Sequence, residues 1–131
     1  MDRVFLDANI LFSAAYRDGA GLQRLWAIED VRLLSSAYAV EEARRNLDTD
    51  EQRARLDSLT ATLELVAQLP AASLPPDVVL PEKDSPILLA AIAGSAAHLL
   101  TGDVRHFGPL FGQSIGGVLV QLPAAYLAGK P

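Results

Sequence analysis

The hydrophobic positions of this chain fall into short blocks that alternate between the spacing of strands and the spacing of helices. Residues 3–7 form an apolar run that predicts a buried strand, and residues 9–15 predict a helix ending near a glycine-rich turn. Apolar side chains within residues 22–28 suit one face of a second helix. Residues 31–35 then predict a second short strand.

The middle of the chain is predominantly helical in its spacing. Ser36 is the expected N-cap of a helix over residues 37–47. Asp50 is the expected cap of a longer helix, whose apolar residues keep a spacing of three and four through residues 56–69. A proline-containing loop is expected at residues 69–76.

The last third returns to alternation. Residues 77–80 predict a third strand, and a cap residue followed by proline predicts a helix over residues 84–97. Residues 99–101 and 118–121 predict the fourth and fifth strands, and residues 123–127 a final short helix.

Strands that alternate with helices favour right-handed parallel crossovers. The pattern therefore predicts an α/β fold, a three-layer α/β/α sandwich with a central parallel sheet of about five strands. A chain of 131 residues with no internal repeat and no linker fits one domain, residues 1–131.

Composition removes several classes of function. Half of the residues are hydrophobic, yet no run approaches the roughly 20 apolar residues of a membrane span. No basic segment precedes an apolar one at the N-terminus, so we expect a cytoplasmic protein without membrane association. The absence of cysteine excludes disulfides and thiolate chemistry, and two histidines make a histidine-rich metal site a poor candidate.

Four acidic residues stand where strand and helix ends would aim them at one place. Asp7 closes the first predicted strand, Asp103 follows the fourth, Asp84 begins a helix and Glu42 lies within one. A parallel sheet gathers the carboxyl ends of its strands into one crevice. Carboxylates gathered there repel one another unless divalent cations neutralise them, and Mg²⁺ or Mn²⁺ is the usual ion for oxygen ligands.

Net charge does not contradict such a site. The formal charge of −5 disfavours a protein that coats nucleic acid non-specifically, because phosphate attracts basic faces. Neutralising the four acids by metal would remove most of this excess, and bound ions make the local potential positive. The acidic composition therefore weakens the case for a nucleic-acid ligand without excluding one.

Each acid also has an ordinary structural explanation. Asp7 and Asp103 suit turns or helix caps, and N-capping alone would explain Asp84 before Ser-Pro. Glu42 lies beside Glu41 and two arginines, a run that is usually a solvated charged face. Taken singly, these residues leave the choice open.

Taken together and in order, the segments resemble the PIN domain family. The resemblance runs over nearly the whole chain and is carried by Val-Phe-Leu-Asp7-Ala-Asn9, Glu41-Glu42-Ala-Arg-Arg-Asn-Leu47, Asp84-Ser-Pro-Ile-Leu-Leu-Ala-Ala91 and Thr101-Gly-Asp103-Val-Arg-His106-Phe107. It implies a compact α/β/α nuclease whose acidic pocket binds Mg²⁺ or Mn²⁺ and hydrolyses phosphodiester bonds of RNA.

The resemblance also implies roles. The acids of the pocket would be Asp7, Glu42, Asp84 and Asp103. Asp7 and Asp103 would hold metal directly, with Glu42 and Asp84 acting directly or through water. Asn9 and Thr101 would support the acids. Glu41 competes with Glu42, which is favoured because the family places its glutamate just before an apolar helical position, here Ala43.

The chain departs from the pattern after Asp103. Some PIN domains carry one more acid there, whereas this chain offers Arg105-His106-Phe107, which leaves open whether one or two ions bind. Ser13, Arg105 and His106 are instead candidates for contact with substrate, His106 with a phosphate.

Stand-alone PIN domains of this size resemble VapC-type toxins, which implies an antitoxin partner and a homodimer. The non-enzyme alternative is a PIN-like scaffold or binding module that is catalytically weak or inactive. A haloacid-dehalogenase-like phosphatase needs a second aspartate where Asn9 stands, and a receiver domain needs paired acids near its start and a late lysine, whereas the lysines here are Lys83 and Lys130. Both rival enzyme classes fit poorly.

Overall fold

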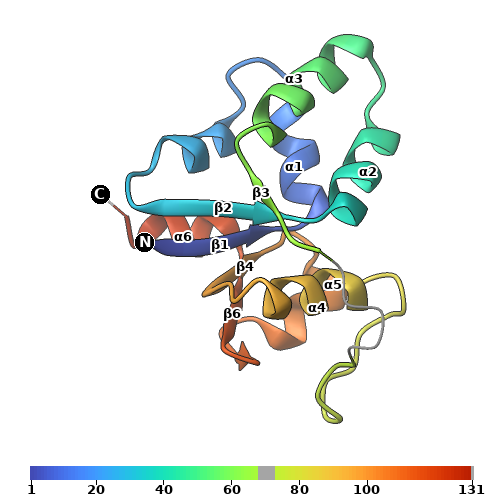
Figure 1. The fold of residues 1–131 in the computed structure, drawn as a ribbon, viewed down its shortest axis with the longest axis vertical. Helices are drawn as coiled ribbons and strands as arrows, with labels where there is room; N and C mark the ends of the chain where they lie inside the picture. The colour runs from blue at the N-terminus through green and yellow to red at the C-terminus, as the bar shows by residue number, and fades with distance from the viewer. Residues whose placement is uncertain (68–72, 131) are drawn as a thin grey trace.

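A six-stranded sheet in the order β3-β2-β1-β4-β6-β5 runs through the centre of the protein (Figure 1). The computed structural model describes residues 1–67 and 73–130. The strands are β1 Asp2–Leu6, β2 Val31–Ser35, β3 Glu64–Leu65, β4 His98–Leu100, β5 Ser114–Ile115 and β6 Val118–Gln121. All neighbouring strands are parallel except β5, which pairs antiparallel with β6.

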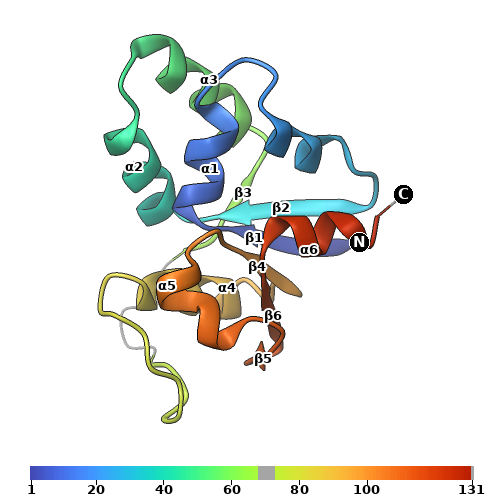
Figure 2. The same ribbon diagram turned by 180° about the vertical axis from the view of Figure 1, so that it is seen from behind.

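Helices cover both faces of this sheet. They are α1 Ala8–Ala15, α2 Ala37–Asn46, α3 Asp50–Thr60, α4 Ser85–Ala93, α5 Val104–Phe107 and α6 Pro123–Ala128, with 3₁₀ helices η1 Gly21–Ala27 and η2 Gly108–Leu110. Helices α1 to α3 lie on one side of β1 and β2, and α4 and α5 lie on the other (Figures 1 and 2). This mixed α/β architecture, with helices flanking a mostly parallel sheet, is the predicted fold class.

The direction of the crossovers explains this layering. From β1 the chain moves outward through β2 to β3, then crosses back over β1 to reach β4 and β6 on its far side. Right-handed crossovers that run in opposite directions place their helices on opposite faces. The direction in which successive strands are added to the sheet thus reverses between the paired neighbours β1 and β4, and this is the switch point of the sheet.

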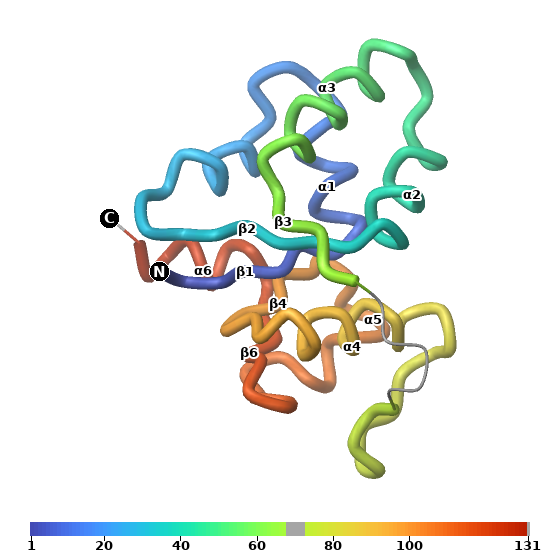
Figure 3. The backbone as a smooth tube through the Cα atoms, viewed as in Figure 1, coloured from blue at the N-terminus to red at the C-terminus, as the bar shows by residue number. Residues whose placement is uncertain are grey.

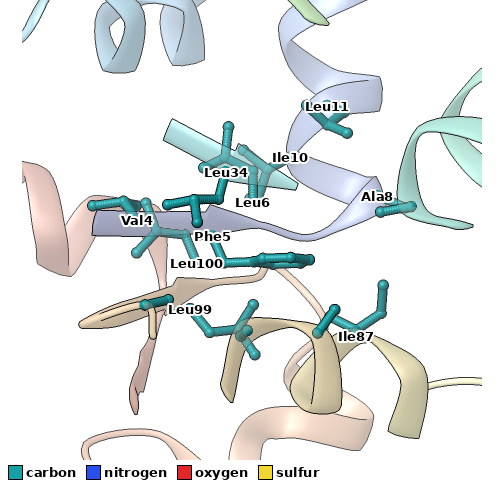
Figure 4. Packing of buried hydrophobic residues seen from close by; sticks show 14 of the residues in the cluster. Val4, Phe5, Leu6, Ala8, Ile10, Leu11, Leu34, Ile87, Leu99 and Leu100 are labelled. Atoms are coloured by element: carbon teal, nitrogen blue, oxygen red, sulfur yellow. The ribbon is translucent and has the colours of Figure 1, made fainter. Parts of the chain in front are cut away.

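Alternating side chains of β1 fill the core on both faces. Phe5 and Leu6 are both fully buried, and they point to opposite sides of the strand. In Figure 4, Leu6 lies toward Ile10 of α1 and Phe5 lies toward Ile87 of α4. Burial of each such side chain contributes about 1.5–3 kcal/mol. A continuous apolar run is typical of a strand that is covered on both faces, as β1 is.

Local capping sets where α2 and α3 begin. Ser36 caps α2 as predicted, since its hydroxyl accepts a hydrogen bond from the Ala39 amide. The cap of α3 is Thr49, and the prediction of Asp50 was wrong by one residue. Thr49 and Gln52 form a reciprocal capping box, in which each side chain accepts from the other residue's backbone amide.

The third strand was predicted in the wrong place. Residues 77–80 form a loop with a turn, and Val79 is 85% exposed. The third strand is β3, inside the region predicted as helix, because α3 ends at Thr60. Glu64 within β3 forms a bidentate ion pair with Arg3 of β1, at 3.2 and 2.6 Å. A two-residue strand held by a long-range ion pair leaves no local hydrophobic signature.

Smaller differences follow from packing. The predicted helix at residues 22–28 is the 3₁₀ helix η1, where the Trp26 indole donates to the Leu59 carbonyl of α3. The antiparallel strand β5 was not predicted. The expected loop at residues 69–76 and the end of the helix predicted through 69 lie partly outside the described residues.

A long loop leads into α4. Residues 73–84 extend away from the rest of the fold and then turn back to the start of α4, as the green and yellow part of the tube in Figure 3 shows. This return brings Lys83 and Asp84 to the carboxyl end of the sheet. Across the part of the chain that the structure describes, no helix has the length and apolar character needed to span a bilayer.

Candidate active site

The site forms where the sheet changes direction. β1 and β4 lie side by side, and the chain leaves their carboxyl ends toward opposite faces. Asp7 immediately follows β1, and Thr101 immediately follows β4. Such a switch point is where open α/β sheets leave a crevice for ligands.

Asp7 is held by three donors. Its Oδ1 accepts from the backbone amide of Ala8 at 2.6 Å. Its Oδ2 accepts from the Thr101 hydroxyl at 2.9 Å and from the Asn9 side-chain amide at 3.2 Å. With only 4% of its surface exposed, the carboxylate has one orientation fixed by β1, α1 and β4 together.

Asn9 and Thr101 join the two strand ends. The Asn9 amide also donates to Thr101 Oγ1 at 3.2 Å, and Asn9 Oδ1 accepts from the Gly102 backbone at 2.8 Å. Thr101 Oγ1 accepts from the Asp103 backbone amide at 3.1 Å. A single network of hydrogen bonds therefore positions both Asp7 and Asp103.

Burial changes the acidity of this site. Desolvation raises the pKa of Asp7 to about 6, opposed by the hydrogen bonds from Thr101 and Ala8 and increased by the charges of Asp84 and Glu42. Desolvation also raises the pKa of Asp84, and Asp103 adds to the rise while His106 and Lys83 oppose it. Carboxylates in such surroundings favour a nearby cation.

The four acids meet at one cavity of about 320 Å³. It is lined by Asp7, Ala8, Asn9, Phe12, Glu42, Asn46, Lys83, Asp84 and Asp103. Glu42 faces the cavity from α2, whereas the adjacent Glu41 is exposed to solvent elsewhere on the helix. Adjacent helical side chains lie about 100° apart, which explains why only one of the two reaches this space.

Three further lining residues were not identified from the sequence. Phe12 follows Asn9 by three positions on α1, and Asn46 follows Glu42 by four on α2, so each shares a helix face with a predicted residue. Lys83 precedes Asp84 in the loop before α4. Helical spacing could have indicated the first two, while only the path of the loop brings Lys83 in.

Asp84 and His106 form a close group with Asp103. His106 Nδ1 lies 2.9 Å from Asp84 Oδ2 and 3.0 Å from Asp103 Oδ2. Neither approach has hydrogen-bond geometry, and among the described residues both Asp84 Oδ2 and His106 Nδ1 lack a hydrogen-bond partner although they are buried. Ligand atoms of Asp84, Asp103 and His106 all lie within 4.8 Å of one another.

This donor set suits a divalent cation. Buried polar atoms without partners are costly, and a metal ion would satisfy them. Two carboxylates and an imidazole are ligands that Mn²⁺ accepts. The carboxylates of Asp7 and Glu42 line the same cavity as Asp84 and Asp103, while His106 contacts Asp84 and Asp103 without lining it. The residues present therefore fit a metal centre on geometric and chemical grounds.

The ordinary explanations of the acids hold in part. Asp7 caps α1, and Asp103 caps α5 by accepting from the His106 backbone amide at 3.1 Å. Asp84 occupies the N-cap position of α4, yet its side chain makes no capping hydrogen bond. Arg44, an expected partner of the glutamates on α2, instead pairs with Asp57 of α3. Capping thus accounts for two acids and leaves Glu42 and Asp84 directed at the cavity.

The remaining predicted residues lie at the margin. Ser13 is exposed and lines a second hollow of about 450 Å³, which shares Asn9 and Asp103 with the acidic cavity. Arg105 is exposed on α5, outside the residues that line either space. His106 lines neither space, and its Nδ1 contacts Asp84 and Asp103.

The fold and site define an α/β domain with four acids at its switch point, and comparison with known proteins identifies the family. The sequence profile of the PIN domain matches residues 3–105. The chain therefore belongs to the PIN domain family, as its motifs predicted. No curated protein sequence matched the chain.

A solved structure shares this fold. It is a chain of VapBC2 from Rickettsia felis, crystallised bound to a DNA fragment from their promoter. The match has a TM-score of 0.66 at 16% sequence identity, and it covers 92% of this chain and 98% of that one. At this identity the likeness concerns the fold.

Proposed function

We propose that this PIN domain is a metal-dependent endoribonuclease that hydrolyses phosphodiester bonds of RNA with Mg²⁺ or Mn²⁺. One observation carries the proposal: carboxylates from four separate segments line a single cavity, where burial raises the pKa of two of them. Grouping like charges in this way weakens the metal-free fold, which is a common feature of sites built for a ligand.

The chain offers a defined set of ligands. Asp7 and Asp103 are our candidates for direct contact, with Glu42 and Asp84 acting directly or through water. His106 joins Asp84 and Asp103 as a further candidate, because its Nδ1 faces both. A bound Mg²⁺ or Mn²⁺ would lower the pKa of a coordinated water and polarise a phosphate oxygen.

The protein's own contribution is orientation. Thr101 and Asn9 hold the Asp7 carboxylate, so its position does not depend on the substrate. Glu42 lines the cavity from α2 and is our candidate to accept a proton from an attacking water. A site fixed before the substrate arrives needs little rearrangement during the reaction.

We extend the proposal to the form of the substrate. The hollow beside Ser13 shares Asn9 and Asp103 with the acidic cavity, so the two spaces are neighbours, and we take the hollow as the candidate path for a strand that reaches the acids. Ser13 and Arg105 are the candidates to contact its backbone. An open path of this kind suits single-stranded RNA, which bends readily.

The biological setting is a further part of the proposal. We propose a toxin whose activity an antitoxin protein controls and which acts as a homodimer in the cytoplasm; the similarity in fold to a VapBC2 chain supports the toxin and antitoxin part. Copurification with the product of a neighbouring small gene would test this.

Cleavage of labelled single-stranded RNA tests the central claim. The purified protein should produce discrete fragments in Mn²⁺ or Mg²⁺, and EDTA should stop the reaction. Asp103→Asn should lose cleavage, whereas Asp77→Asn, at an exposed aspartate in the loop before α4, should retain it.

The alternative is a PIN-like scaffold without catalysis. It retains the acids but would show the same residual cleavage in the intact protein and in Asp103→Asn, on several RNA substrates. Equal rates after removal of contaminating nuclease would therefore favour the scaffold.

A further inference from the structure

The cavity that holds the acids also holds a cation, Lys83. Lys83 belongs to the loop that returns to the sheet before α4, next to Asp84. Within residues 1–67 and 73–130, its ammonium group forms no ion pair within 4.0 Å. Several arginines and Lys130, by contrast, are paired with carboxylates.

A hydrogen bond from another element fixes the backbone at this residue. The Tyr38 hydroxyl donates to the Lys83 carbonyl at 2.7 Å. Tyr38 lies on α2, one turn before Glu42, so the bond joins the helix that carries Glu42 to the loop that carries Asp84. The lysine side chain therefore starts from a fixed point at the wall of the cavity.

We propose that Lys83 binds a phosphate of the RNA substrate beside the metal site, and that Tyr38 is a positioning residue for it. This inference rests on the proposed nuclease function. The cavity carries an excess of negative charge, which repels a polyanion. A lysine that is left unpaired, at the edge of that charge, offers the phosphate a compact cationic contact.

Opposite effects on two ligands separate this role from general damage. Lys83→Met removes a positive charge from beside the acids, so Mn²⁺ should bind more tightly in the absence of RNA. The same change should lower the affinity for RNA about ten-fold, since a charged contact with phosphate is lost. A misfolded variant would lose affinity for both ligands.

Titration calorimetry measures the affinity for Mn²⁺. Cleavage kinetics with a labelled single-stranded oligonucleotide measure kcat and KM for RNA. Lys83→Met should raise KM with little change in kcat. It should also reduce the slope of log kcat/KM against log salt by about 0.7, the value for one phosphate contact on a single strand. Lys83→Arg should retain most of the affinity, and Arg24→Met is the matched control, at an exposed cation that lines a different hollow with Asp30.

Tyr38→Phe tests the positioning role. Loss of the hydroxyl should raise KM by a smaller factor and leave the salt slope unchanged, because the charge of Lys83 remains. If Lys83→Met changes neither KM nor the salt slope, the phosphate role is wrong even where cleavage occurs. If the protein cleaves no RNA, anisotropy of the labelled oligonucleotide in Mn²⁺ reports binding directly. Loss of affinity in Lys83→Met would then support the subsite without the nuclease, and equal affinity would overturn it.

Discussion

The hydroxyl of Thr101 donates to the carboxylate of Asp7 at 2.9 Å, across 94 positions of sequence. Both side chains are buried, and each comes directly after one of the two strands between which the sheet changes direction. The bond therefore connects the ends of β1 and β4 at the site itself. Stability and site geometry depend on the same atoms.

Thr101→Val tests this coupling. The valine methyl group cannot donate to Asp7 or accept from Asn9 and Asp103, so buried polar groups lose their partner. The free energy of unfolding in urea should fall by about 1–3 kcal/mol. Thr62→Val removes an exposed local hydrogen bond to Leu59 and should change stability by less than about 0.5 kcal/mol. Equal losses in the two variants would contradict a special role for Thr101.

The raised pKa of Asp7 makes metal-free stability depend on pH. Its carboxyl group has a pKa of about 6 in the folded protein against 3.8 as the ordinary value. Between these values the unfolded chain releases the proton and the folded protein keeps it. The stability contributed by this group is thus complete below about pH 4 and is lost as pH rises through 6, up to about 3 kcal/mol.

Urea unfolding in EDTA, from pH 4.5 to pH 7.5, measures this loss. The pKa of Asp84 is raised too, which adds a change of the same sign. Asp7→Asn cannot titrate and should show a flatter dependence on pH than the intact protein. Parallel curves for the two proteins would show that Asp7 ionises normally in the fold.

The adjacent glutamates of α2 offer an internal control for the catalytic claim. Glu42 lines the cavity and Glu41 is exposed, so equal chemical changes at the two positions should have unequal effects. Glu42→Gln should lower kcat for RNA by about 10²-fold, because a charge that acts on the reaction is lost. Glu41→Gln should leave kcat unchanged. A larger loss in Glu41→Gln would reverse the assignment.

The sequence predicted the elements whose own residues determine their structure, and it missed those placed by contacts with distant parts of the chain. The apolar run of β1 and the spacing of α2 identified these elements, since each buries its own side chains. β3 could not be found this way, because Glu64 is placed by its pairing with Arg3 of another strand. Asp7, Asp84 and Asp103 stand out because they follow strands or precede helices, and Glu42 stands out through its motif within α2, whereas Lys83 enters the cavity only through the path of its loop.

His106 separates what the sequence suggested from what the geometry favours. The sequence assigned it to a phosphate of the substrate, while the structure places its Nδ1 against Asp84 and Asp103. If His106 is a metal ligand, His106→Ala should weaken Mn²⁺ binding about ten-fold or more in the absence of RNA. Titration calorimetry with Mn²⁺ measures this directly.

The other histidine supplies the control for this last prediction. His98 contacts Gln121 and Asp2 in a separate cluster, so His98→Ala should leave the Mn²⁺ affinity unchanged even if the fold loses stability. A phosphate role predicts the reverse for His106→Ala: unchanged affinity for Mn²⁺ and a raised KM for RNA. The two measurements on one variant therefore decide whether the imidazole serves the ion or the substrate, because a ligand acts before RNA is present and a phosphate contact only afterwards.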